Sequence, residues 1–136
     1  MPFQKLFDIM IYETKYFKVN QDWEIPIPGF FIVASKRKVK SITDLNKPEA
    51  QELVAIVRKV RAAMEKVLKI KEVCLLQDES SSHFHVWLLP RYSWMKKVGL
   101  YSFGSILNYA RKNRMDAKNI QNVKEAALKV KKYLRK

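Results

Sequence analysis

Apolar residues recur at three- and four-residue spacing over residues 48–69, which is the clearest helical pattern in the chain. Asn46 is placed to cap this helix, while Pro48 and Glu49 suit its first turn. The pattern predicts one long amphipathic helix with a single buried face. The predicted stripe consists of Ala50, Leu53, Val54, Val57, Val60, Met64, Val67 and Leu68.

Short runs of β-branched and aromatic residues, bounded by turn residues, predict strands. These runs cover residues 9–12, 16–20, 30–35, 72–77 and 83–89. The polar stretches 13–15 and 78–82 are short enough to join antiparallel neighbours. The unbroken apolar run 30–35 is typical of a strand covered on both faces.

The pattern changes after Pro90. Residues 91–102 mix aromatic residues with lysines without a clear period, which predicts a loop, and 105–113 predicts a short helix. Residues 119–134 predict an amphipathic C-terminal helix that docks on this domain or on a second subunit. Its apolar stripe consists of Ile120, Val123, Ala127, Val130 and Leu134.

This order of elements predicts an α+β fold, in which a long helix covers one face of a mostly antiparallel sheet. The C-terminal helices are additional to that core. A length of 136 residues with 48% hydrophobic residues suits one well-cored domain, so we expect residues 1–136 to form a single domain.

The chain is strongly basic, with 27 Lys and Arg against 13 Asp and Glu and a formal net charge of +14. Such a charge attracts polyanions, among them nucleotides, nucleic acid and membrane surfaces. The cations concentrate in residues 36–40, 96–97 and 131–136. An alternative for the C-terminal cluster is a solvated helix face without a partner.

The single cysteine, Cys74, lies in an apolar run and predicts a small buried side chain rather than a disulfide. No apolar run approaches the roughly 20 residues of a membrane span, and the N-terminus lacks the pattern of a signal peptide. We therefore expect a cytoplasmic protein without a membrane partner.

Both histidines of the chain lie in one predicted strand, two residues apart. Because strand side chains alternate between faces, His83, His85 and Trp87 share one face with Leu89. The other face is uniformly apolar and belongs to a core. A serine-rich turn, residues 80–82, precedes the strand and places hydroxyl groups beside the imidazoles.

Three interpretations of this pair remain open. A metal site needs further ligands, and only Asp78 and Glu79 lie near in sequence, so we predict neither metal nor cofactor. Two hydrogen-bonded core histidines are a purely structural alternative. The third is nucleophilic chemistry on phosphorus, because a neutral imidazole is a competent nucleophile and serine hydroxyls donate to phosphate oxygens.

Residues 83–91 (His-Phe-His-Val-Trp-Leu-Leu-Pro-Arg) resemble the motif of the histidine-triad superfamily, His-φ-His-φ-His-φ-φ with φ apolar. Residues 28–38 are similar to that family's Pro-Gly-His strand and the turn after it, and residues 43–45 fit the approach to its long helix. The resemblance covers residues 9–91 and implies a histidine-triad fold, leaving a C-terminal helical extension over 104–135. It also implies a homodimer.

In that family the middle histidine attacks the α-phosphorus of a nucleotide, and the resemblance assigns this role to His85, supported by His83. It assigns the ribose hydroxyls to Asp22 and a base pocket to Ile27, Phe30 and Ile32. Lys96, Lys97 or Arg91 would neutralise further phosphates. The principal substrate-binding residues that the resemblance implies are Asp22, Phe30, Gln77, Ser80, Ser82, Trp87 and Arg91.

The sequence departs from the family pattern at four places. Trp87 stands where the third histidine should be, and an indole cannot shuttle a proton to a leaving group. Phe30 and Lys38 replace two upstream histidines, and the turn before His83 is shorter than the family's glycine-rich loop. The implied function is hydrolysis or nucleotidyl transfer on a nucleoside polyphosphate, a dinucleoside polyphosphate such as diadenosine polyphosphate, or a phosphoramidate. The alternative is a non-catalytic module that binds nucleotides or nucleic acid.

Overall fold

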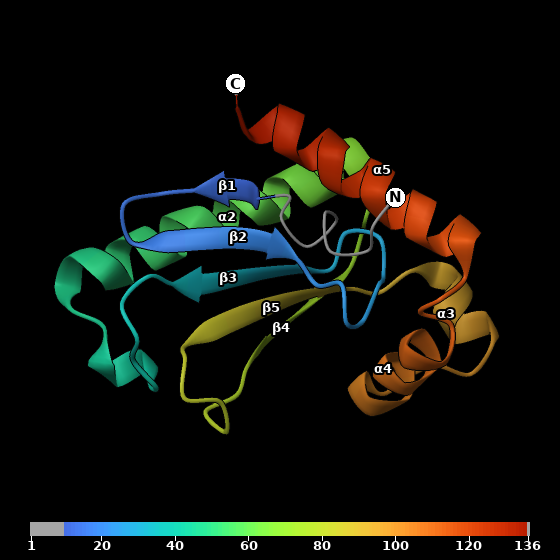
Figure 1. Cartoon of the computed structure of the whole chain (residues 1–136), viewed down its shortest axis with the longest axis horizontal. Helices are drawn as coiled ribbons and strands as arrows, with labels where there is room; N and C mark the ends of the chain where they lie inside the picture. Colours follow the sequence, from blue (N-terminus) through green and yellow to red (C-terminus); the bar gives the residue numbers. More distant parts are fainter. Residues whose placement is uncertain (1–9, 136) are drawn as a thin grey trace.

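The computed structural model describes residues 10–135, in which five strands form one antiparallel sheet in the order β1-β2-β3-β5-β4 (Figure 1). The strands are β1 (Met10–Glu13), β2 (Phe17–Gln21), β3 (Phe31–Ser35), β4 (Val73–Gln77) and β5 (His85–Pro90). The predicted α+β class and both predicted antiparallel pairs are confirmed. The predicted start of the first strand, Ile9, lies outside the described residues.

The predicted long helix is α2 (Lys47–Leu68), and its start is capped as the sequence indicates. The Asn46 side chain accepts from the Glu49 backbone N–H at 2.9 Å, and the Glu49 carboxylate accepts from the Asn46 N–H at 2.8 Å. The predicted stripe is wrong at two positions, because Ala50 and Val54 are exposed. Val54 lies about 100° round the helix from the buried Leu53, beyond the edge of the packed face.

The core lies between one face of the sheet and the helices α2 and α5 (Ala117–Leu134). In Figure 1, α2 runs behind the strands and α5 passes diagonally beyond β1. Helix α5 contacts α2 and β1 within this chain, so the docking of its apolar stripe is intramolecular. Its buried Ala127, Val130 and Leu134 join the same core as the aromatic side chains of the sheet. Those aromatic residues are Phe17, Phe31 and Phe84.

The prediction that residues 30–35 form a strand covered on both faces is wrong for one face. Phe31 and Val33 are fully buried, whereas Ile32 and Ala34 on the opposite face are half-buried. Polar side chains flank this second face, since Ala34 pairs with Lys18 and His85. The open face of the sheet is therefore the floor of a surface site rather than a second core.

The C-terminal third adds a second apolar cluster at one end of the sheet. The predicted loop 91–102 is wrong in part, because residues Ser93–Lys97 form the short helix α3. Five residues are too few to show a helical period, and burial of Met95 among Ile27 and Leu89 holds this turn in place. The predicted short helix is α4 (Phe103–Lys112), and a 3₁₀ turn, η1 (Ile42–Asp44), precedes α2.

Cys74 is only half-buried in the edge strand β4, rather than buried as expected. The reason is its position, because an edge strand has a neighbour on one side only. Over residues 10–135, no helix combines the length and the apolar character needed to cross a bilayer.

Candidate functional site

His85 begins strand β5 and lies opposite Ala34 of β3 on the open face of the sheet. The predicted alternation is confirmed, since Leu88 belongs to the core behind the sheet and Trp87 packs with the second cluster. His83 precedes the strand instead of belonging to it. Phe84 between the two histidines is anchored by backbone hydrogen bonds, donating to Val39 at 2.6 Å and accepting from Ser35 at 3.1 Å.

The His85 ring has a defined hydrogen-bonding state. Its Nδ1 lies 2.7 Å from the carbonyl oxygen of His83. A carbonyl only accepts, so Nδ1 carries the proton and donates, which leaves the lone pair on Nε2. The His85 ring is therefore oriented with its unprotonated Nε2 away from the carbonyl that holds Nδ1.

His83 is itself held by the end of β3. Its Nε2 donates to the backbone carbonyl of Ser35. The Ser81 hydroxyl accepts from the His83 backbone N–H at 3.2 Å and bonds its carbonyl at 3.3 Å. This arrangement fixes the carbonyl that orients His85, which makes His83 a positioning residue through its backbone.

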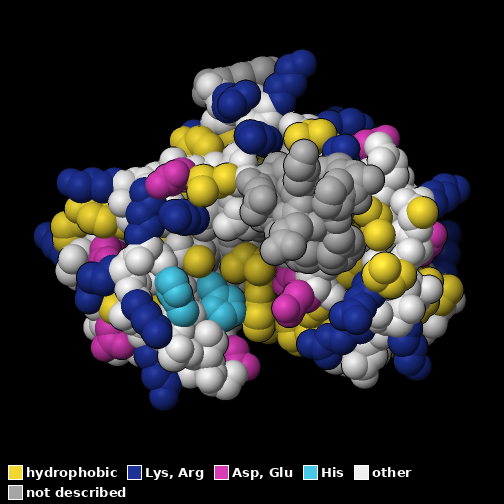
Figure 2. All heavy atoms as spheres, viewed as in Figure 1, with side chains coloured by type: hydrophobic (Ala, Val, Ile, Leu, Met, Phe, Trp, Pro, Cys, Tyr) yellow, Lys and Arg dark blue, Asp and Glu magenta, His cyan; other side chains and the backbone are white. Residues whose placement is uncertain are grey.

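The open face carries a hollow of about 380 Å³, which His85 and Trp87 line together with the loop after β2. The remaining lining residues are Gln21, Asp22, Trp23, Glu24 and Ile32. Figure 2 shows the two histidine side chains side by side at the surface, next to hydrophobic side chains in the middle of this face. His83 lines a different, adjacent hollow of about 360 Å³ with Lys18 and Lys36.

Asp22 shares the hollow with His85 although 63 positions separate them in the chain (85 − 22). Its side chain is buried, and its Oδ1 accepts from the Ile25 backbone N–H at 2.9 Å. Burial raises the pKa of this carboxyl above its usual range, opposed by the backbone N–H groups of Ile25 and Glu24. Gln21 steadies the loop by donating to the carbonyls of Asp22 and Ile27 at 3.0 and 2.9 Å.

Trp87 forms a wall of the hollow. Its ring meets His85 edge-on, with centroids 4.7 Å apart at 70°, and lies 6.1 Å from the ring of Phe103 in α4. The indole Nε1 is buried and has no hydrogen-bond partner among residues 10–135. The indole therefore packs against the His85 ring and presents no donor at the surface in this conformation.

The other proposed contacts lie apart from the hollow. Phe30 is wholly buried in the second cluster, and Ile27 is 5% exposed, so neither side chain reaches the surface here. Gln77 ends β4 half-buried without lining the hollow. Ser80 and Ser82 are exposed in the turn, where the Ser80 backbone N–H donates to Asp78 at 2.8 Å.

Arg91 follows the far end of β5 from His85. Its guanidinium donates to the carbonyl of Tyr101 at 2.5 Å, and it lines a separate groove with Lys96. Lys96 pairs with Glu72 at 2.9 Å. These cations do not converge on the His85 hollow.

The hollow contains three residues that the sequence did not single out, Gln21, Trp23 and Glu24. Their adjacency to Asp22 was the available signal. The role of Ser35 in holding His83 had none, because it depends on the pairing of strands far apart in the sequence. Within residues 10–135, no group of three or more His, Cys, Asp or Glu side chains could hold a metal ion.

A family model described as HIT domain matches residues 5–94, about two thirds of the chain. A search of curated proteins found no match. The Caenorhabditis elegans NitFhit protein is 25% identical, with a TM-score of 0.56 over 78% of this chain, which spans only 27% of that protein's chain.

Two further solved structures are similar in fold. A hypothetical histidine triad nucleotide-binding protein from Sulfolobus tokodaii has a TM-score of 0.64 at 18% identity, covering 93% of this chain and 85% of its own. A Zn-bound histidine triad family protein from Mycobacterium smegmatis has a TM-score of 0.63 at 18% identity, covering 93% and 83%.

Proposed function

The chain belongs to the HIT-domain family, and on that premise we propose that it binds a nucleotide at the His85 hollow and cleaves or transfers it at the α-phosphate. One observation carries the proposal. The His85 Nδ1 donates to the His83 carbonyl at 2.7 Å, which leaves the Nε2 lone pair free, while the same ring lines a hollow with Asp22.

The proposed reaction has two steps. Nε2 of His85 attacks the α-phosphorus, forming an N–P bond while the bond to the leaving group breaks and its electron pair departs with that group. Water or another acceptor then attacks phosphorus, loses a proton to solvent, and returns the N–P electron pair to Nε2. The His83 carbonyl accepts a hydrogen bond from the Nδ1–H of His85 throughout and stabilises the positive charge that develops on the ring.

The remaining residues of the hollow would bind the nucleotide. The Asp22 carboxylate can accept from both ribose hydroxyls, and Ile32 with Trp23 offers apolar surface for the base. Ser80 and Ser82 in the preceding turn would donate to phosphate oxygens, and Gln77 and Arg91 would act only after side-chain movement. Phe30 would support the base pocket from the core.

Trp87 limits the range of leaving groups. An indole cannot protonate a departing group, and its N–H is buried. Leaving groups that are stable as anions therefore suit the site better than amines. We accordingly favour polyphosphates, including dinucleoside polyphosphates such as diadenosine polyphosphate, over phosphoramidates.

The wider setting of this proposal is a homodimer in the cytoplasm that needs no cofactor or metal for this chemistry, with the chain acting as a single domain. The edge strand β4 carries the exposed Leu75, which offers apolar surface for a second copy. Nucleic acid is a further candidate ligand because of the net charge of +14.

The decisive experiment substitutes the nucleophile. The protein is incubated with adenosine and guanosine polyphosphates and phosphoramidates labelled at the α-phosphate, and a nucleotidyl adduct on His85 is sought by mass spectrometry. We expect His85→Asn to lose the adduct and at least about a thousandfold in turnover, while nucleotide affinity stays within about threefold.

His83→Asn is the matched control, since the chain has two histidines only. It should slow the reaction yet still form the adduct, because the backbone carbonyl that orients His85 remains. Equal turnover by His85→Asn and wild type would overturn the proposed mechanism. Tight nucleotide binding with no turnover of any substrate would instead favour the non-catalytic alternative.

A further inference from the structure

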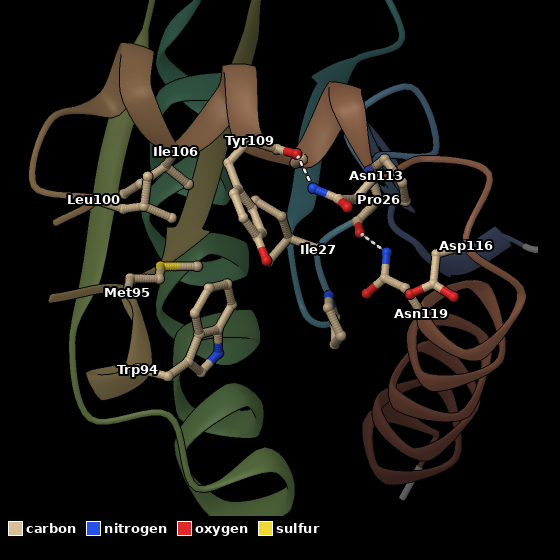
Figure 3. A pocket seen from close by; sticks show the side chains of 12 residues that line it. Pro26, Ile27, Trp94, Met95, Leu100, Ile106, Tyr109, Asn113, Asp116 and Asn119 are labelled. Atoms are coloured by element: carbon tan, nitrogen blue, oxygen red, sulfur yellow. Dashed lines mark hydrogen bonds between the residues drawn. The ribbon is translucent and has the colours of Figure 1, made fainter. Parts of the chain in front are cut away.

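A second cavity of about 150 Å³ lies between the loop that precedes β3 and the C-terminal helices (Figure 3). It shares no lining residue with the His85 hollow. Its apolar floor is made by Ile27, Met95, Leu100 and Ile106, all buried or half-buried. An apolar cavity of about 150 Å³ is large enough to hold a benzene ring. Most of its lining follows residue 94, where the family match ends.

Two aromatic rings form a corner at the mouth of this cavity. The rings of Trp94 and Tyr109 lie 5.7 Å apart at 53°, and the side chains are 42% and 44% exposed. Trp94 also stacks on Tyr92 at 6.5 Å and 14°, and the Tyr92 hydroxyl donates to the carbonyl of Pro28. The corner is thus held in place before any ligand arrives, with π-faces available at the opening.

The opposite side of the mouth presents hydrogen-bond acceptors. Asn119 donates from its amide nitrogen to the carbonyl of Pro26 at 2.7 Å, and Asn113 donates to the carbonyl of Tyr109 at 2.8 Å. Figure 3 shows both bonds, with Asp116 beside Asn119. Each amide nitrogen has one N–H engaged, and Oδ1 of Asp116 accepts from the Lys118 backbone N–H at 3.2 Å. The amide oxygens and Oδ2 of Asp116 are acceptors at this side of the mouth.

The charge of the lining differs from that of the whole chain. The protein has 27 Lys and Arg in 136 residues, yet the cavity is lined by none of them. Asp116 is the single charged residue among the described lining residues. Arg114 and Lys118 flank Asp116 in the chain but do not line the cavity. The mouth is therefore suited to a cation or a hydrogen-bond donor.

We propose that this cavity binds a small aromatic ammonium compound. The aromatic ring of the ligand occupies the apolar floor. The ammonium group lies between the ring faces of Trp94 and Tyr109 on one side of the mouth and the Asp116 carboxylate on the other, so cation–π attraction and charge pairing act on the same group. This site is independent of the nucleotide chemistry proposed for His85.

The test compares three probes that differ only in their polar end. Isothermal titration at physiological ionic strength measures the affinity of 2-phenylethylamine, 2-phenylethanol and 3-phenylpropionate for the full chain. We expect the amine to bind about tenfold more tightly than the alcohol, and the carboxylate to bind more weakly still. NMR should show the amine shifting the indole N–H signal of Trp94 and sparing that of Trp87.

Two variants localise the binding, each with a matched control. Tyr109→Ala should weaken amine binding about fivefold or more, whereas Tyr101→Ala, at an exposed tyrosine outside the cavity, should not. Asp116→Asn retains a residue that can cap α5 and should remove the preference for amine over alcohol. Glu125→Gln removes a charge from the same helix outside the cavity and should retain the preference for amine over alcohol.

The proposal is overturned by equal affinity for all three probes, by tightest binding of the carboxylate, or by no binding at all. It is equally overturned if amine binding is unchanged in Tyr109→Ala or Asp116→Asn. Loss of nucleotide turnover in His85→Asn has no bearing on these titrations, so the two proposals fail separately.

Discussion

Asp22 is the titratable residue whose surroundings most directly affect the proposed site. Burial raises its pKa, while the Ile25 N–H still hydrogen-bonds its Oδ1 at 2.9 Å. A carboxyl whose folded pKa exceeds its unfolded value, about 3.9, adds stability below that value. This contribution is lost as the pH rises through the folded pKa, so the ionised group weakens the fold at neutral pH.

Asp22→Asn should therefore raise the melting temperature at pH 7 and lose this advantage in acid, because Asn keeps the acceptor and removes the buried charge. Nucleotide affinity of the wild type should fall on acidification at a pH above about 3.9, since a protonated carboxyl accepts poorly from ribose. The variant should bind more weakly and without that pH dependence. Thermal unfolding and titration calorimetry across pH measure both effects.

Asp78 provides a control of opposite sign. Hydrogen bonds from Ser80 lower the pKa of this carboxyl, so its contribution is present above about 3.9 and is lost as the pH falls through the folded pKa. Asp78→Asn should lower the melting temperature at pH 7. Equal changes of melting temperature in Asp22→Asn and Asp78→Asn would contradict the opposite pKa directions of the two carboxyls.

The positions of the two histidines were predicted from the sequence only in part. The spacing of His83 and His85 placed both imidazoles near one face, and the structure agrees. The sequence did not reveal that they line different hollows, because that depends on where β5 begins and on the hydrogen bond from His83 to Ser35.

At the scale of elements, the start of helix α2 is set by hydrogen bonds in its first turn. Asn46 and Glu49 satisfy each other's backbone N–H groups, and Arg37 donates to the Glu49 carboxylate at 2.8 and 3.1 Å. The cap thereby links the start of α2 to the turn that follows β3.

Asn46→Ala should destabilise the protein by about 1 kcal/mol, because the Glu49 N–H loses its acceptor. Chemical denaturation measures the change in the free energy of unfolding. Asn122→Ala, at an exposed position inside α5, is the matched control and should be neutral or slightly stabilising. A loss in the control as large as in Asn46→Ala would argue against the capping explanation.

Two elements show where pattern reasoning stops. Helix α3 is too short to display a period, and burial of Met95 rather than propensity maintains it. Strand β3 has an apolar sequence on both faces, yet its Ile32 and Ala34 are left half-buried. A strand face is covered only where another element packs on it, and the pattern of apolar residues within the strand does not show whether such an element is present.

For the whole molecule, the net charge of +14 is the property that acts over the longest distance. Lys18 and Lys36 line the hollow beside His83, although Lys36 is paired with Glu13 at 2.5 Å. The summed field attracts polyanions over about a Debye length. Ligand charge should therefore determine how strongly binding depends on salt.

Raising the salt concentration from about 50 mM to about 500 mM should weaken the binding of adenosine tetraphosphate by about 3- to 10-fold. Adenosine, which has no charge, is the control and should change little. Titration calorimetry at matched ionic strengths compares the two slopes. Identical slopes would show that the field of the protein does not contribute to nucleotide binding.

By itself, the sequence determined the α+β class, the long capped helix, the antiparallel strand pairs and the histidine pair. For the apolar stripe of the C-terminal helix it left two options, of which docking within this chain is the one observed. These features depend on local periodicity and on residue chemistry, which a chain carries along its length. The tertiary structure decided that Asp22 meets His85, that Arg91 does not, and that a cavity opens beside Trp94. Those outcomes depend on strand register and helix docking, which arise from contacts between residues far apart in the chain.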